Sequence, residues 1–190
     1  MVFGSLFGKR KKRSPAPDAG SLGDSVKEAR IGDVFTVTGL SLEYEDSYLI
    51  VEKMNRYESA SGEWFEILGV DGDKQLWVQW SGGGGLFVTA NAGAKPVGLN
   101  QVGVTEDDLI RMDDEHSIDN HIDYEGVRYS YKNSSEAAYY QDNKGEGEGY
   151  YLWEFSAEEK VLSIDKWEGM PFQAFVSDVV PPESITVYKR

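Results

Sequence analysis

The chain has no cysteine and only 2 histidines among its 190 residues. The lack of cysteine excludes disulfide bonds, a thiolate nucleophile and a cysteine-ligated zinc site, and it is compatible with a reducing cytoplasm. Proline is scarce, with 6 residues, and no apolar run approaches the roughly 18 to 20 residues that span a bilayer. We therefore expect a soluble folded part that is long enough to bury a hydrophobic core without disulfide bonds or a structural metal.

Basic residues are rare outside one short run. Residues 9–13 hold five of the 19 basic residues, so the rest of the chain has 14 basic residues against all 33 acidic ones. A strongly acidic body repels phosphate backbones. We expect no nucleic-acid binding by the folded part.

The first 13 residues combine apolar side chains with that basic run. Rings at the acyl boundary and a cationic cluster are features of a reversible anchor at an anionic membrane surface. A disordered solubilising tail is an equal alternative, and a nuclear-import patch is a third. The basic run follows the apolar residues, which is the reverse of a secretory signal. The candidate membrane-contact residues are Phe3, Leu6, Phe7, Lys9, Arg10, Lys11, Lys12 and Arg13.

The chain is rich in aromatic residues, at 13%, and has 21 glycines. This composition is typical of short strands joined by tight turns. Asp71-Gly72 between two apolar runs predicts a two-residue hairpin. Thr105 is a fair helix N-cap before three acidic residues, which predicts one short helix over 105–112. Strands are expected at 32–39, 48–51, 64–70, 75–80, 86–89 (an edge strand), 122–125, 127–131, 137–141, 150–156, 161–167, 172–177 and 185–188.

The sequence also echoes itself at a spacing of 87 residues without a gap. The two copies match in side-chain size and in the placement of glycine: Trp64 with Tyr151, Trp77 with Ile164, Trp80 with Trp167 and Gly82 with Gly169. This predicts an all-β fold of two similar antiparallel units, barrel-like or sandwich-like, packed together with at most one or two short helices. The expected organisation is a tip (1–13), a linker (14–27), a first unit (28–103), a short helix with an acidic linker (104–120) and a second unit (121–190).

Both histidines lie in the acidic linker DDEHSIDNHID. His116, His121, Asp119 and Asp123, with Asp113 and Asp114, supply ligands for a weakly bound calcium or zinc ion. A spacing of five residues does not put two imidazoles on one helix face. A solvated linker is therefore the favoured interpretation, and no cofactor is expected.

Trp80 and Trp167, each followed two residues later by glycine, are the sharpest paired feature. A tryptophan beside a small residue is able to stack on a sugar or a peptide. The simpler interpretation is a core tryptophan for which glycine makes room. We favour the core.

No catalytic constellation stands out. A pair of carboxylates is able to act as general acid and base. Because the chain has 33 acidic residues, the presence of such a pair in the sequence does not indicate a catalytic site. The GxSxG elbow is absent, and Gly82–Gly85 lacks the Gly-Lys-Ser/Thr ending of a phosphate loop. We expect no enzymatic activity.

Several short motifs occur along the chain: Ile31-Gly32-Asp33, Tyr124-x-Gly126-x-x-Tyr129, Trp153-Glu154-Phe155, Leu162-Ser163-Ile164-x-x-Trp167 and the segment 179–187. With these motifs the chain resembles the bacterial domain-of-unknown-function family numbered 4178, over about residues 29–188. The resemblance implies a β-rich module without established activity, sometimes encoded near phage-shock-type membrane-remodelling proteins, and it transfers no functional residue. The acidic linker does not belong to that pattern.

The sequence therefore predicts a cytoplasmic, non-catalytic binding or scaffolding module with a protein partner, acting near the inner membrane surface. A metal-dependent enzyme or sensor using the acidic linker is the first alternative. A glycan-binding module using Trp80 or Trp167 is the second.

Overall fold

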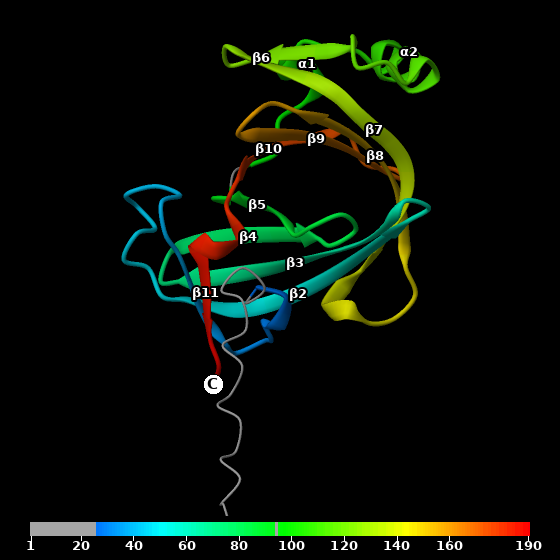
Figure 1. Ribbon diagram of the computed structural model, residues 1–190. Coiled ribbons are helices and arrows are strands. Elements are labelled where there is room, and N and C mark those ends of the chain that lie inside the picture. Colours follow the sequence, from blue (N-terminus) through cyan, green and yellow to red (C-terminus); the bar gives the residue numbers. More distant parts are fainter. Residues whose placement is uncertain (1–25, 94) are drawn as a thin grey trace, which may run out of the picture.

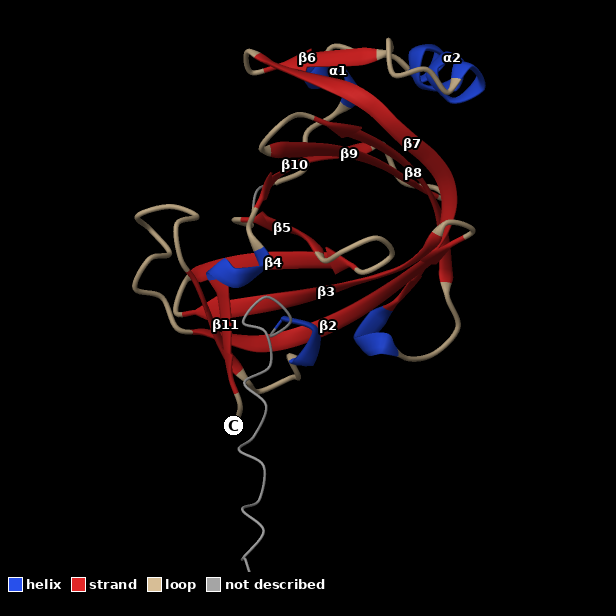
Figure 2. Ribbon diagram, viewed as in Figure 1, coloured by secondary structure: helices blue, strands red, loops and turns tan. Residues whose placement is uncertain are grey.

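The computed structural model describes residues 26–93 and 95–190. In this part of the chain nearly all regular structure is strand, with two α-helices and short 3-10 turns (Figure 1, Figure 2). The first half holds β1 (Val34–Val37), β2 (Leu49–Ser59), β3 (Gly62–Asp71), β4 (Lys74–Ser81) and β5 (Phe87–Asn91). After α1 (Leu99–Val102) and α2 (Glu106–Glu115) come β6 (His121–Tyr124), β7 (Val127–Tyr140), β8 (Glu148–Ser156), β9 (Lys160–Trp167), β10 (Gln173–Val179) and β11 (Ile185–Tyr188).

Eight of the strands close into one antiparallel barrel. The sheet runs β11-β1-β2-β3-β4-β5-β10-β9-β8-β7-β6, and an additional pairing of β2 with β7 closes β2-β3-β4-β5-β10-β9-β8-β7 into a ring. The expected β-dominated, antiparallel fold is therefore confirmed. The two halves of the sequence contribute four strands each to a shared barrel.

Two seams join the halves. At one, Ala90 lies opposite Asp178 and Thr89 opposite Val179. At the other, four residue pairs join the end of β2 to the end of β7. The prediction of an edge strand at 86–89 is wrong, because β5 is paired on both sides. The last strand, β11, pairs with β1 and so returns to the first half, whereas the sequence analysis placed it in the second unit.

β2 and β7 are much longer than the sequence indicated. Residues 127–131 and 137–141 were expected as separate strands, but β7 continues through the polar stretch between them, and β2 extends eight residues beyond Val51. Each strand carries a register shift, between Val51 and Lys53 in β2 and between Tyr131 and Asn133 in β7. Such irregularities bend a strand and increase its twist. β7 accordingly curves around the side of the barrel (Figure 1).

The pairing register corrects the 87-residue echo by one position. Trp64 lies opposite Ser81 in the first half, and Tyr150 opposite Trp167 in the second, which is a spacing of 86 residues. Because side chains alternate between the faces of a strand, a slip of one residue exchanges inside for outside. The echo therefore paired residues that face opposite ways.

The predicted turn and helix signals hold. Gly72 has φ +64° in the two-residue hairpin between β3 and β4. The Thr105 hydroxyl accepts the N–H of Asp108 at 3.2 Å, which caps α2. The helix runs three residues past the expected end, and α1 lies in a segment for which no helix was predicted.

Two apolar cores lie on the outer faces of the barrel strands, one in each half. The first contains Phe35, Leu49, Ile67, Leu76, Val78, Trp80 and Val88 and is completed by β1 and β11. The second contains Tyr129, Trp153, Phe155, Leu162 and Ile164 and is completed by Val102, Leu109 and Met112 of the two helices. The barrel strands thus bury their outward side chains, which leaves the inward side chains free to be polar.

Candidate ligand-binding lumen

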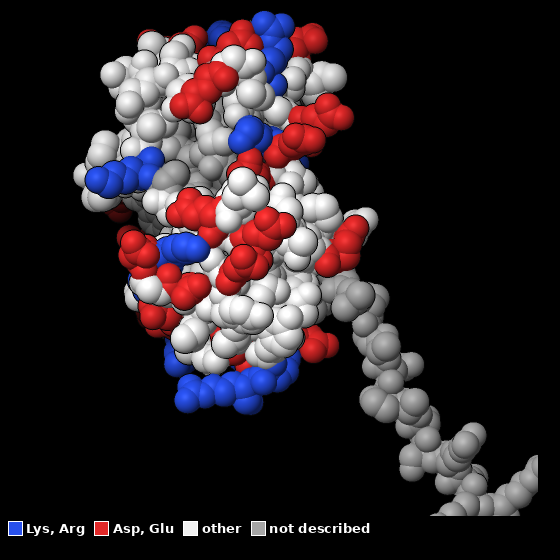
Figure 3. All heavy atoms as spheres, turned by 90° about the vertical axis from the view of Figure 1, so that its left-hand side faces the viewer, with Lys and Arg blue, Asp and Glu red and all other residues white. Residues whose placement is uncertain are grey.

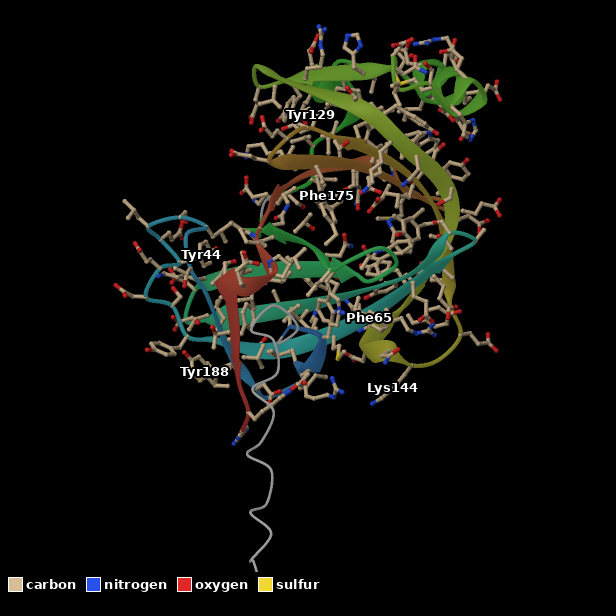
Figure 4. All side chains as sticks on the ribbon, viewed as in Figure 1. Tyr44, Phe65, Tyr129, Lys144, Phe175 and Tyr188 are labelled. Atoms are coloured by element: carbon tan, nitrogen blue, oxygen red, sulfur yellow. The ribbon has the colours of Figure 1, made fainter. Side chains whose placement is uncertain are left out.

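A cavity of about 1360 Å³ fills the barrel. Every one of the eight barrel strands contributes to its lining, and Phe175 of β10 is one of the lining residues (Figure 4). We call this cavity the lumen. Small-molecule sites in proteins commonly measure about 300 to 1,000 Å³. The lumen is therefore large enough to enclose an organic molecule together with water.

Alternation along the strands determines what lines the lumen. In β4, Gln75, Trp77 and Gln79 face the lumen, whereas Leu76 and Val78 between them are fully buried in the first core. β9 repeats this arrangement, with Asp165 in the lumen beside the buried Ile164. Most apolar side chains of the two strands thus pack in the outer cores, whereas mainly polar and aromatic side chains, with Val161 of β9, line the lumen.

Five aromatic rings form a continuous group on the lumen wall. Tyr57 stacks on Trp64 with centroids 5.3 Å apart and planes 1° apart. Tyr150 stacks on Trp167 at 4.3 Å. Tyr139 joins the two pairs, at 5.2 Å from Tyr57 and 5.7 Å from Trp167. We call this group the aromatic cluster; it comes from five strands and crosses the seam between β2 and β7.

Glu66 presents a carboxylate to the lumen beside this cluster. Its Oε1 accepts hydrogen bonds from Asn55 Nδ2 at 2.9 Å and from the Tyr57 hydroxyl at 3.0 Å. Burial raises the pKa of Glu66 above its ordinary value, and these two hydrogen bonds oppose the rise. Burial also raises the pKa of Tyr57, so its hydroxyl stays protonated and donates.

Asp165 on β9 presents another carboxyl group to the lumen. Within residues 26–93 and 95–190 this side chain has no hydrogen-bond or ion-pair partner. Burial, and then the negative charge of Glu66, raise the pKa of Asp165 to about 7. The side chain is partly accessible, as expected for a group that borders an internal cavity. Asp165 is thus a carboxyl group held in the protein interior without a protein counter-charge.

The two acids do not occupy equivalent places in the two halves. With the register of the paired strands, Glu66 corresponds to Leu152 and Asp165 corresponds to Gln79. All four residues line the lumen. The scaffold is duplicated, whereas each acid occurs once.

Lys132, the one lysine or arginine in the described lumen lining, is already paired. Its Nζ lies 2.8 Å from Glu154 Oε1 and 4.9 Å from the centroid of the Phe87 ring. Asn133 donates to the other oxygen of Glu154 at 3.1 Å. The positive charge of Lys132 is therefore directed to Glu154.

The two tryptophans singled out from the sequence lie in different environments. Trp80 is 4% exposed, packs in the first core and has its ring centroid 5.8 Å from that of Phe65, although it also borders the cavity. Trp167 belongs to the aromatic cluster. The lumen also contains Trp64 and Trp77, which the sequence analysis did not treat as binding residues.

Of the linker candidates, His121 and Asp123 lie near each other, with Nε2 3.8 Å from Oδ2, but the set does not converge on one point. His116 ends α2 and lies edge-on to Tyr131, whereas the His121 Nδ1 lies 3.0 Å from the Asp119 carbonyl. Arg128 donates to both oxygens of Asp123, at 2.8 and 2.9 Å. In the described part of the chain no three His, Asp or Glu side chains converge as metal ligands.

The membrane-contact candidates at residues 3–13 lie outside the described residues. In residues 26–93 and 95–190, no helix is both long and apolar enough to cross a membrane. Acidic side chains are spread over the face of the body in Figure 3, with basic side chains between them.

Sequence reasoning missed Glu66 and Asp165 because acidic residues are so numerous. A signal was present in each case, since each acid lies within a strand directly beside a fully buried isoleucine, Ile67 or Ile164. A carboxyl at such a position faces either solvent or an internal cavity. The sequence alone does not separate these two alternatives.

Fold and site together define a closed β-barrel with an internal, aromatic and acidic cavity. The chain matches the model of the family described as "Domain of unknown function (DUF4178)" over residues 38–182, and it belongs to that family. No curated protein and no solved structure matches it.

Proposed function

We propose that this protein binds a small organic molecule inside its barrel, as a non-catalytic binding module. The observation that carries the proposal is the lumen of about 1360 Å³, lined by all eight barrel strands. Binding sites are typically concave, with aromatic walls and a few polar groups that orient the ligand. The aromatic cluster and the two carboxyl groups supply both features.

The arrangement of the cores supports this proposal. The interior of an eight-stranded barrel is either filled by side chains or holds one small ligand. Here the apolar side chains of the barrel strands face outward into two separate cores, so the fold has a stable core in each half while the lumen stays open. This arrangement, with the cores outside and the interior open, is the one expected of a barrel that binds a ligand in its lumen.

A thermal-shift screen with a library of soluble metabolites of positive, zero and negative charge tests the proposal. We expect some compounds to raise the melting temperature, because a ligand that binds only the native state stabilises it. The variants Ser163→Trp and Ser135→Trp place an indole in the lumen from two different strands and should weaken those shifts. Ser41→Trp, at an exposed loop position, is the matched control and should retain them.

Circular dichroism of each variant shows whether the barrel is folded. The proposal is contradicted if no compound stabilises the protein. It is also contradicted if both folded lumen variants respond like the wild-type protein.

A further inference from the structure

We propose that the ligand of the lumen is an organic cation, an amine or quaternary ammonium with an apolar body, held by Asp165, Glu66 and the aromatic cluster. This inference rests on the proposed function and adds the chemical class of the ligand.

Asp165 supplies the first argument. A buried carboxylate without a counter-charge is costly, and proteins normally pair such a group or leave it protonated. Asp165 lines the lumen, and no described residue provides a hydrogen bond or a positive charge to it. A ligand with a positive group would provide the missing partner.

Glu66 supplies the second argument. Asn55 and Tyr57 both donate to Oε1, and no described residue donates to Oε2. The hydrogen bonds fix the orientation of the carboxylate while its second oxygen remains available to a donor. This is the geometry of a positioned acceptor.

The charge balance of the lining argues against an anionic ligand. The acidic residues in the lining are Glu63, Glu66, Glu148, Glu154 and Asp165, against Lys132 alone among lysines and arginines. Lys132 is paired with Glu154, and Glu63 lies 3.2 Å from Arg56. An anionic ligand would meet the carboxyl groups of Glu66 and Asp165, and the described lining offers it no basic side chain that is not already paired.

The aromatic cluster favours a cation over a neutral ligand. The faces of tryptophan and tyrosine rings attract ammonium groups by about 0.5 to 2 kcal/mol, most strongly in desolvated sites. Tyr150 links this surface to the acids: burial raises the pKa of its phenol, and the negative charges of Asp165 and Glu66 raise it further. The ring of Tyr150 stacks on Trp167 at 4.3 Å, so the acids and the ring faces lie in one region of the lumen.

Apolar side chains elsewhere in the lining define the rest of the ligand. Leu152, Val161 and Phe175 face the lumen from β8, β9 and β10. A charged group alone would leave these surfaces in contact with water. We therefore infer a hydrocarbon or aromatic body attached to the cationic group.

Isothermal titration calorimetry with three probes of one shape tests the inference. The probes are 4-phenylbutylamine, 4-phenylbutanol and 4-phenylbutyrate, which share a hydrocarbon body and carry a positive, zero and negative charge. We expect the amine to bind about tenfold or more tightly than the alcohol, the change that about 1.4 kcal/mol produces. The carboxylate should bind most weakly.

Two conservative variants assign the effect to the acids. Asp165→Asn and Glu66→Gln keep size and polarity but remove the charge, so each should lower the affinity for the amine and leave that for the alcohol nearly unchanged. Asp46→Asn, at an exposed loop position outside the lumen, makes the same charge change and should bind like the wild-type protein.

The outcomes separate this inference from the proposed function. If the alcohol binds as tightly as the amine, or if Asp165→Asn and Glu66→Gln leave the preference for the amine unchanged, the cation inference is overturned while a binding lumen stands. If none of the three probes binds, the cation inference is overturned, and the thermal-shift screen decides separately whether the binding lumen stands.

Discussion

Tyr150 and Trp167 lie directly opposite each other in β8 and β9, and their rings stack with centroids 4.3 Å apart and planes 13° apart. Stacked pairs of this kind contribute about 0.5 to 1.5 kcal/mol beyond the area they bury. Both rings line the lumen. The pair therefore stiffens the wall of the lumen while it presents an aromatic surface to the interior.

Truncation of Trp80 and Trp167, the two tryptophans that the 87-residue echo matched, should distinguish a core side chain from a lumen side chain. Trp80→Ala should lower the free energy of unfolding by about 3 to 5 kcal/mol, because the ring is 4% exposed and packs in the first core. Trp167→Ala should cost clearly less, because its ring borders open space, and it should weaken the binding of 4-phenylbutylamine. Urea unfolding followed by circular dichroism measures both, and equal losses of stability would contradict these assignments.

The pH dependence of stability should report Asp165. Its folded-state pKa of about 7 lies above the ordinary value of 3.8, so the native state holds this proton more tightly than the unfolded chain. The resulting cost is absent below about pH 4, grows as the pH rises to about 7 and is constant above that. Asp165→Asn removes the cost, so its gain in melting temperature over the wild-type protein should follow the same curve.

The other charged or phenolic groups of the lumen lining are present in both proteins. They are Glu63 and Glu66 from β3, Glu148, Glu154 and Tyr150 from β8, Lys132 and Tyr139 from β7, and Tyr57 from β2. Because the negative charge of Glu66 helps to raise the pKa of Asp165, the comparison measures the Asp165 carboxyl together with its interaction with Glu66. A gain that is the same at pH 4 and pH 8 would show that the carboxyl of Asp165 is not buried without a partner.

Gly69 should not tolerate alanine. A Cβ atom at this position would collide with the ring of Phe35 and lie 2.9 Å from the Cβ of Leu49, and all three residues belong to the packed first half. We expect Gly69→Ala to cost at least about 2 kcal/mol, since overpacked cores must shift their backbone. Gly83→Ala, where a Cβ meets nothing within 4 Å, is the control and should be nearly neutral in the same urea titration.

The sequence-based hypothesis of a membrane-surface tip has a separate test. Full-length protein should float with liposomes that contain anionic lipid, and a form that begins at Ser21 should not, because the truncation removes the basic run at residues 9–13. Equal flotation of the two forms, or flotation of neither, would contradict the anchor.

Local chemistry made much of the fold predictable. The hairpin turn at Gly72-Asp73 and the Thr105 cap depend on residues within a few positions of each other, and the sequence predicted both the hairpin and the cap. The barrel closure was not predictable in this way, because β2 and β7 meet through pairs such as Tyr57 with Tyr139, which are far apart in the sequence. The polar residues between 131 and 137 lack the apolar alternation that indicates a strand, so β7 was predicted as two separate strands.

The candidate site was harder to predict for a related reason. The pairing register decides which face of the sheet each side chain points to. The 87-residue echo differs from the true register by one residue, so it grouped Trp80 of the core with Trp167 of the lumen. Asp165 looks like one of many acidic residues until the neighbouring strands show that its side of β9 faces the lumen. The information that defines the site is thus held in long-range pairing.

Indole N–H signals in proton–nitrogen NMR spectra test the central claim most directly, because the five tryptophans report separately on lumen and core. Trp64, Trp77 and Trp167 line the lumen, whereas the Trp153 indole is buried in the second core and donates to the Leu109 carbonyl at 3.2 Å. On titration with 4-phenylbutylamine, we predict that the three lumen signals shift in a saturable way and that the Trp153 signal does not move. Saturable binding that leaves the three lumen signals unchanged would contradict a ligand site inside the barrel.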